Sequence, residues 1–213
     1  HTWNNNFRWD SNFTLSHNKN KIKELVRDYV HPETGELINK DRLDVGGLGK
    51  ARFILKEGGT LGDLYTQSDL KRDDNGMVDI DPTGIVAIEN NLPDIKLGSV
   101  FPKANLAWSN HFSWKGISLS ALFTARIGGI VYSATEAAMD QYGVSERSAL
   151  ARDNGGVLVN NRTLVDAQNY YTTIGSESGL PQYYTYNATN VRLQEASIGY
   201  LIPRKWLGNV CDC

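Results

Sequence analysis

In the first part of the chain the apolar residues fall on odd positions only. Trp3, Phe7, Trp9, Phe13 and Leu15 take odd positions, and the even positions from residue 2 to residue 16 are polar throughout. A period of two residues predicts a β-strand with one apolar and one polar face. Strands in globular proteins average about 5–6 residues, so an alternation of this length is typical of a large barrel or a long two-faced sheet.

The segment 104–129 repeats this pattern twice, in opposite phase, around Lys115-Gly116. The apolar residues before the dipeptide occupy even positions (Leu106, Trp108, Phe112, Trp114), and those after it occupy odd positions (Ile117, Leu119, Ala121, Phe123, Ala125, Ile127). We therefore expect an antiparallel hairpin with a tight turn at Lys115-Gly116.

The last alternating segment, 190–202, changes phase in its middle. Val191 and Leu193 are odd, whereas Ala196, Ile198, Tyr200 and Ile202 are even. The phase slip near Gln194-Glu195 predicts a β-bulge. Pro203 should end the strand, and residues 204–209 should form a turn.

The remaining segments read mainly as loops. We expect loops over 18–50 and 82–103, and one strand over 51–66 that is interrupted by its glycines. Asn75-Gly76 predicts a hairpin turn before a short strand over 77–81. Asp73 and its neighbours do not match a calcium loop, which requires a glycine at its sixth position.

One short helix is expected within a long excursion between the last two strands. Ser133 and Glu136 have the spacing of a capping box, and Gly143 suits the residue after a helix end, so we predict a helix over 134–142. The rest of the excursion, to residue 190, reads as a loop with two aromatic clusters. These clusters contain Tyr170, Tyr171, Tyr183, Tyr184 and Tyr186.

Composition restricts the class of protein without fixing it. The net charge of −2 gives no electrostatic case for nucleic acid. No run of eighteen apolar residues predicts a spanning helix, but a spanning strand needs only about 9–11 residues. The apolar faces could therefore contact lipid in a barrel, or a second sheet in a soluble sandwich. Short turns at one end, long loops at the other and strongly polar opposite faces favour the barrel.

Several stretches resemble the SusC/RagA-type TonB-dependent outer-membrane transporters of Bacteroidota. They are "LPDIKLGSVFPKANLAWSNHFSWKGISLSALFTARIGGIVYSATEAAMDQYG", "NATNVRLQEASIGYLIPRKWL", "LKEGGTLGDLYT" and the opening segment. The matches keep the family's order over nearly the whole chain. The resemblance implies an all-β fold, part of an antiparallel barrel of about twenty-two strands around a plug. It makes residues 1–213 the C-terminal portion of that barrel, with the plug and the final strands outside this sequence.

The same resemblance implies a location in the bacterial outer membrane and a role in nutrient uptake. It implies import of glycans or oligopeptides, energy from TonB through the plug, and a SusD-like surface lipoprotein as a lid. The alternative from the residues alone is a soluble all-β carbohydrate-binding or adhesion module. Neither reading is an enzyme, and a hydrolase is only a distant third alternative, because no catalytic constellation, carboxylate pair, cofactor motif or metal-ligand spacing stands out.

The alternation assigns side chains to the two faces. Trp residues at positions 3, 9, 108 and 114 match aromatic girdles. The residues expected to touch lipid are Trp3, Phe7, Trp9, Phe13, Leu106, Trp108, Phe112, Trp114, Leu119 and Phe123. Those expected to face the lumen are Arg8, Asp10, His111 and Arg126.

Two further groups of residues remain open to more than one reading. The five tyrosines could contact substrate, or they could pack the excursion on itself or against the lid. Cys211 and Cys213 would share one strand face, which makes a disulfide between them unlikely on geometric grounds and leaves a metal without further ligands.

Overall fold

The computed structural model describes residues 2–3 and 7–203. The chain divides into two compact units. The sheet unit comprises 1–19, 102–128 and 188–213, and the loop unit comprises 20–101 and 129–187. The expected turn at 204–209, Cys211 and Cys213 lie outside the described residues.

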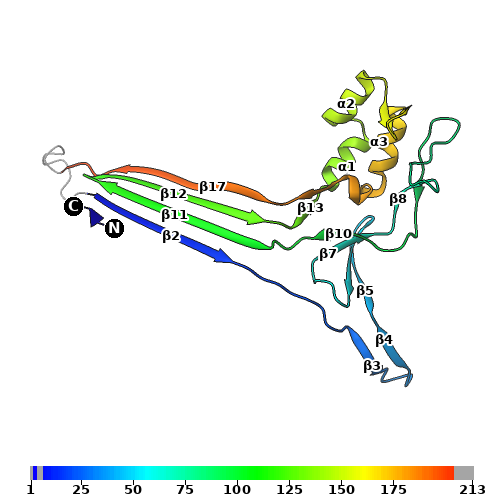
Figure 1. The fold of residues 1–213 in the computed structure, drawn as a ribbon, viewed down its shortest axis with the longest axis horizontal. Coiled ribbons are helices and arrows are strands. Elements are labelled where there is room, and N and C mark those ends of the chain that lie inside the picture. The colour runs from blue at the N-terminus through cyan, green and yellow to red at the C-terminus, as the bar shows by residue number, and fades with distance from the viewer. Residues whose placement is uncertain (1, 4–6, 204–213) are drawn as a thin grey trace. The chain divides into compact units, whose positions relative to one another are not determined.

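The sheet unit is one antiparallel sheet in the order β1-β2-β11-β12-β17 (Figure 1). Its strands are β1 (Thr2–Trp3), β2 (Phe7–Ser16), β11 (Ala104–Trp114), β12 (Ile117–Ile127) and β17 (Asn190–Tyr200). The sheet is open, and the described strands do not close into a barrel. The prediction of an antiparallel all-β fold is therefore confirmed at this level, and the barrel remains a prediction.

The hairpin of β11 and β12 is the one that the alternation predicts. Lys115 and Gly116 have φ values of 47° and 86°, and two successive positive φ values are typical of the two-residue turn that matches the twist of a hairpin. The strands pair without interruption from Trp114 opposite Ile117 to Ala104 opposite Ile127.

The predicted bulge in β17 is also confirmed. Leu193 pairs with Phe123 and Glu195 pairs with Leu122, so that Gln194 is the additional residue. A bulge adds one residue to one strand. It therefore returns both apolar halves of β17 to the same face, although their positions differ in parity.

The first part of the loop unit corrects the expected loops at 18–50 and 82–103. The first contains β3 (Val26–Val30), β4 (Leu37–Lys40) and β5 (Arg42–Leu48), and the second contains β9 (Ile88–Glu89) and β10 (Ile95–Ser99). The expected single strand over 51–66 is two strands, β6 (Ala51–Lys56) and β7 (Asp63–Thr66), because Gly58, with φ of 82°, lies in a chain reversal between them. A four-stranded sheet results, in the order β10-β7-β6-β5.

The turn at Asn75-Gly76 is present, but the strand expected after it is not continuous. Asp73 accepts backbone hydrogen bonds from Asn75 and Met77, both of 2.9 Å, which fixes the turn. Residues 77–81 form only isolated bridges, of Val78 with Arg72 and of Ile80 with Val86.

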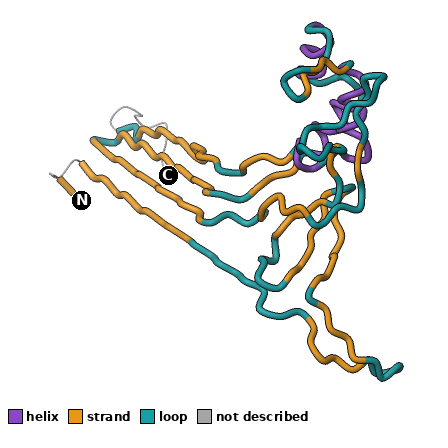
Figure 2. The backbone as a smooth tube through the Cα atoms, turned by 45° about the vertical axis from the view of Figure 1, so that its right-hand side comes forward, coloured by secondary structure: helices purple, strands orange, loops and turns teal. Residues whose placement is uncertain are grey.

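The helices belong to the second part of the loop unit (Figure 2). The predicted helix is α1 (Ala134–Gln141), and Ser133 accepts a hydrogen bond from the Glu136 N–H at its start. The excursion also contains α2 (Glu146–Asp153), α3 (Ala167–Gly175) and the 3₁₀ helices η1 (Ser176–Ser178) and η2 (Pro181–Tyr183), where we expected loop. Its short strands are β13 (Ile130–Tyr132), β14 (Val157–Val159), β15 (Thr163–Val165) and β16 (Thr185–Asn187).

A small hydrophobic core lies in the helical part of the loop unit. Residues of α1, α3, β14 and β15 meet Leu180 and Tyr184, and the hairpin of β8 (Asp69–Leu70) and β9 adds Leu70. No described helix is both long and apolar enough to cross a membrane.

Candidate functional site

The candidate site is the pair of faces of the four long strands β2, β11, β12 and β17. The cross-strand register aligns their side chains in rows perpendicular to the strands. One row joins Trp9, Phe112, Leu119 and Ile198, and another joins Phe13, Trp108, Phe123 and Leu193. Because directly opposite residues lie on the same face of a sheet, these rows form one continuous apolar face.

Two pairs of stacked aromatic rings lie on this apolar face. The rings of Trp9 and Phe112 stack with their centroids 5.8 Å apart, and those of Trp108 and Phe123 stack at 5.9 Å. The face is nevertheless open: Phe13 is 62% exposed and Ile198 is 81% exposed. A contiguous exposed apolar surface of this kind marks a contact with another apolar phase or partner.

A row of small residues separates the two bulky rows. It consists of Ser11, Asn110, Ala121 and Ala196. The Nε1–H of Trp9 donates to Asn110 Oδ1 at 3.2 Å, and the Nε1–H of Trp108 donates to Ser11 Oγ at 3.0 Å. Asn110 is only 7% exposed. The indoles therefore contribute hydrogen-bond partners for two polar groups within the apolar face.

The opposite face is polar along the same four strands. Arg8 and Asp10, both predicted for this face, form an ion pair with 2.7 Å between Arg8 Nε and Asp10 Oδ2. His111 lies opposite Asp10 in the register, and its Nδ1 is 2.8 Å from Ser120 Oγ. Arg126 pairs in the register with Asn105 and occupies the same face.

The structure thus brings the predicted sets together on two faces. The side chains expected on the apolar face share it, apart from Trp3, whose side chain lies outside the described part of the chain. What covers each face stays a prediction. Asn110 is the residue of this site that the alternation did not identify, because it is a polar residue in the apolar phase of β11. Within the described residues, no group of three His, Cys, Asp or Glu side chains could hold a metal ion.

Tyr184, one of the five candidates for contact with substrate, packs inside the loop unit. Its ring is fully buried in the core. Its hydroxyl donates to Asp140 Oδ2 at 3.0 Å, and the guanidinium of Arg147 lies 4.9 Å from its ring centre. Burial and the neighbouring Asp140 raise the pKa of Tyr184 above its ordinary value. The packing alternative therefore applies to Tyr184, and it offers no ring surface to a ligand here.

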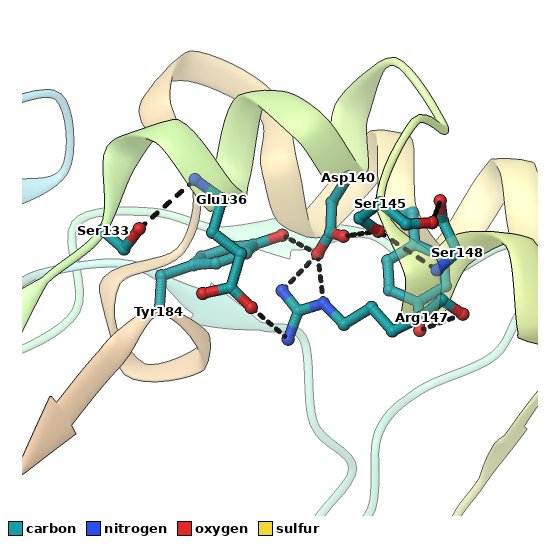
Figure 3. A network of polar contacts seen from close by, with 8 residues as sticks. Ser133, Glu136, Asp140, Ser145, Arg147, Ser148 and Tyr184 are labelled. Carbon is teal, nitrogen blue, oxygen red and sulfur yellow. Dashed lines mark hydrogen bonds and ion pairs between the residues drawn. The ribbon is translucent and has the colours of Figure 1, made fainter.

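Asp140 is the centre of the polar network around Tyr184 (Figure 3). Its buried carboxylate also accepts hydrogen bonds from Ser145 and from Arg147, whose Nε lies 2.7 Å from Oδ2. Burial alone would lower the pKa of Arg147, but the Asp140 hydrogen bond and charge raise it instead. Ser145 also caps α2 by accepting a bond from the Ser148 N–H. The network connects the end of α1, the start of α2 and Tyr184. Its role is therefore structural.

The other four tyrosines differ in exposure. Tyr170 and Tyr171 meet edge to face at 5.5 Å, and together with Tyr183 they pack partly buried against the core. Tyr186 is the most exposed of the five, with 42% of its surface accessible to solvent. Contact with substrate is thus open mainly to Tyr186, and it remains a prediction.

A second charged cluster lies in the four-stranded sheet of the loop unit, and sequence reasoning missed it. Asp94 accepts two hydrogen bonds from Arg42, at 2.8 and 3.0 Å, and a contact from Lys56 at 2.6 Å. These partners, Arg42 foremost, hold the pKa of Asp94 far below its ordinary value. The partners are 52 and 38 residues away in the chain, so no local motif could have indicated them.

Comparison with known proteins assigns the chain to no family. No protein-family model matches it, and no curated protein matches it.

Proposed function

We propose that β2, β11, β12 and β17 form part of the wall of an outer-membrane β-barrel, with the apolar face toward lipid and the polar face toward the lumen. The observation that carries this proposal is the continuous apolar face, exposed on one side of four strands whose other side is polar. In an aqueous sandwich the apolar side of a sheet packs against a second sheet. In a membrane barrel lipid takes the place of that sheet.

The lengths of the strands support a membrane span. β2 has 10 residues, and β11, β12 and β17 have 11 each. A tilted strand crosses the hydrocarbon layer with about 9–11 residues. The outer edge of β17 has no partner among the described strands. Since an open edge in lipid leaves backbone groups unsatisfied, the proposal requires further strands to complete the wall.

The short and long connections give the wall an orientation. The Lys115-Gly116 turn joins β11 and β12 directly, whereas the loop unit connects the opposite ends of the long strands. Barrels of the bacterial outer membrane have short periplasmic turns and long extracellular loops. We therefore place Lys115-Gly116 on the periplasmic side and the loop unit on the cell surface.

The proposed activity is transport rather than catalysis. On the resemblance to SusC/RagA-type transporters, the wall belongs to a TonB-dependent importer of glycans or oligopeptides, covered by a SusD-like lipoprotein. Arg8, Asp10, His111 and Arg126 would then line a plugged lumen. Tyr186, exposed in the loop unit, would be the aromatic ring best able to contact substrate or lid.

Single cysteines along β12 test the two faces. Cys211 and Cys213 are first replaced by serine, and one cysteine is then introduced at each position from 117 to 127 in the protein in its native outer membrane. We expect odd positions such as Leu119 and Phe123 to react with a lipid-soluble maleimide and to resist a membrane-impermeant one. Ser120 and Thr124 should show the reverse preference once the lumen is accessible.

The same experiment separates the proposal from its alternative. A soluble carbohydrate-binding module would be recovered without detergent. Its odd positions would be protected from both reagents by protein, or would react with the water-soluble one. Either result would refute the barrel wall. A charged maleimide that reacts equally at odd and even positions would contradict the two-faced arrangement itself.

A further inference from the structure

A pocket of about 380 Å³ lies on the polar face of the sheet unit, at the end of the long strands away from the Lys115-Gly116 turn. Residues of β2, β11, β12 and β17 line it, and its charged members are Arg126 and Arg192. No acidic residue is part of this lining. The pocket therefore carries positive charge that its own lining does not balance.

The strand register places the two arginines side by side. Arg126 of β12 is opposite Asn190 of β17, and Thr124 is opposite Arg192. The two arginines are therefore diagonal neighbours on one face of the sheet. Diagonal neighbours in an antiparallel pair are about 7–8 Å apart, which is within the reach of long side chains. A small anion in the pocket can thus be within reach of both arginines.

Asn190 holds the guanidinium of Arg192 in place. Its Oδ1 accepts a hydrogen bond from Arg192 Nε at 2.8 Å, and its Nδ2 donates to the Ala188 carbonyl at 2.8 Å. The terminal nitrogens of Arg192 have no acceptor and no ion pair among the residues that the structure describes. A guanidinium fixed through Nε still has two terminal nitrogens that can donate in parallel to both oxygens of a carboxylate.

Another arginine of the same face, Arg8, has its charge balanced within the sheet. It forms the 2.7 Å ion pair with Asp10. The acidic residue that follows Arg192 on β17 is Glu195, which is opposite Leu122 and does not line the pocket. The described carboxylates of this face therefore neutralise Arg8 and leave the charge of Arg192 for a ligand.

We propose that this pocket binds a carboxylate group of the imported substrate, with Arg192 as the main contact and Arg126 beside it. The inference rests on the proposed function, in which the polar face lines the path of the substrate. In the proposed orientation the pocket lies near the extracellular end of the strands, where substrate enters. Peptides carry such a carboxylate at the C-terminus, and acidic glycans carry it on their uronic acid units.

Arginine footprinting of the full-length protein in detergent tests this inference. Phenylglyoxal, which modifies accessible guanidinium groups, is added with or without a probe, and mass spectrometry gives the reaction rate at each arginine. The probes are penta-alanine and its C-terminal amide, and trigalacturonate and its methyl ester. At about ten times its dissociation constant, a probe with a free carboxylate should slow Arg192 about tenfold. The amide and the ester should not, and the exposed Arg162 of the loop unit should react equally throughout.

The two pairs of probes identify the source of the carboxylate. Protection by the peptide acid alone would make the substrate a peptide, and protection by trigalacturonate alone would make it an acidic glycan. Substitutions then test the contact by calorimetric titration of the protective probe. Arg192→Gln should weaken binding about tenfold or more. Arg192→Lys keeps the charge but loses the planar pair of donors, so its effect should be intermediate. Arg162→Gln should leave the affinity unchanged.

Other outcomes would overturn the inference. Equal protection by acid and amide or ester, no protection by any probe, or an unchanged affinity in Arg192→Gln would exclude carboxylate recognition here. Protection by inorganic phosphate and by neither acid would assign the pocket to a soluble anion. An Arg192 that resists phenylglyoxal without any probe would be assigned to a carboxylate of the protein itself. The cysteine scan of β12 keeps the two proposals distinct: if β12 contacts lipid while Arg192 stays unprotected, only the carboxylate inference fails.

Discussion

Phe123 offers the sharpest test of which phase the apolar face contacts. It lies near the middle of β12, in the row with Phe13, Trp108 and Leu193, and it stacks on Trp108 at 5.9 Å. The substitution Phe123→Lys removes this ring contact, which is worth about 0.5–1.5 kcal/mol. It also puts a charge where the proposal places lipid, at a cost of about 2–4 kcal/mol near the bilayer midplane.

The combined effect should be about 2.5–5.5 kcal/mol, which corresponds to about two to four orders of magnitude in the ratio of assembled to unfolded protein. Two control variants separate the causes. Phe123→Leu loses the ring but stays apolar, so it should cost about 1–1.5 kcal/mol. Thr124→Lys puts the same charge one residue further, on the polar face. It gives up an exposed contact of 3.3 Å to Gln194, so its cost should stay below about 1 kcal/mol.

The assay is a urea titration of the membrane-embedded protein, followed by its heat-modifiable electrophoretic mobility. The predicted order of midpoints is wild type and Thr124→Lys, then Phe123→Leu, then Phe123→Lys well below the others. If Phe123→Lys and Phe123→Leu had equal midpoints, the charge at this position would lie in water. If Thr124→Lys were the more damaging change, the two faces would be assigned the wrong way round.

Three further predictions concern the loop unit and the bulge. Lys50→Met removes the 2.9 Å ion pair to Glu177, whose backbone has a φ of 51°. Because this pair holds the segment around Glu177, its loss should speed cleavage after Glu177 by a glutamate-specific protease about fivefold. Because the Arg42 contact depresses the pKa of Asp94 below its ordinary 3.8, the pair stabilises the fold above about pH 4 and its contribution is lost as the pH falls further. Thermal unfolding from neutral to acid pH should therefore depend less on pH in Asp94→Asn. Deletion of Gln194 should change the free energy of unfolding, obtained from the urea titration, by less than about 1 kcal/mol, because the residues on either side already face their own partners.

The long strands could be predicted because their information is local. Alternation over about ten residues defines both faces of a strand, and Lys115-Gly116 supplies a turn that needs no distant partner. The bulge at Gln194 could be predicted for the same reason: a change of parity within one strand is visible in the sequence alone. The place of Asn110 on the apolar face could not be predicted, because its side-chain oxygen accepts a hydrogen bond from Trp9, which is 101 residues away.

The loop unit was largely missed because its order comes from distant contacts. The strands β3 to β5 have 4–7 residues with little alternation, and they are stabilised by pairing rather than by a pattern of their own. The helices α2 and α3 begin at ordinary caps, Ser145 and Asp166, but their apolar faces are short. A Tyr-rich segment such as 183–186 gives no sign that Tyr184 is buried against Asp140 and Arg147, which lie some forty residues earlier.

Among the described residues, buried apolar side chains occur in the loop unit and not in the sheet unit, and this contrast bears on the proposed function. Part of the loop unit resembles the interior of a protein in water: Leu180, Tyr184 and their apolar neighbours form a core, and the buried Asp140 is paired with Arg147. In the sheet unit the apolar rows are exposed, and the polar Asn110 and Ser11 in their midst are bonded to indole N–H groups. A face in contact with water would not need such pairing, because water would satisfy the amide and the hydroxyl. Internal pairing of scarce polar groups on an otherwise apolar surface is what a hydrocarbon environment demands. The contrast therefore supports the proposal, in which lipid contacts the apolar face of the long strands and water surrounds the loop unit.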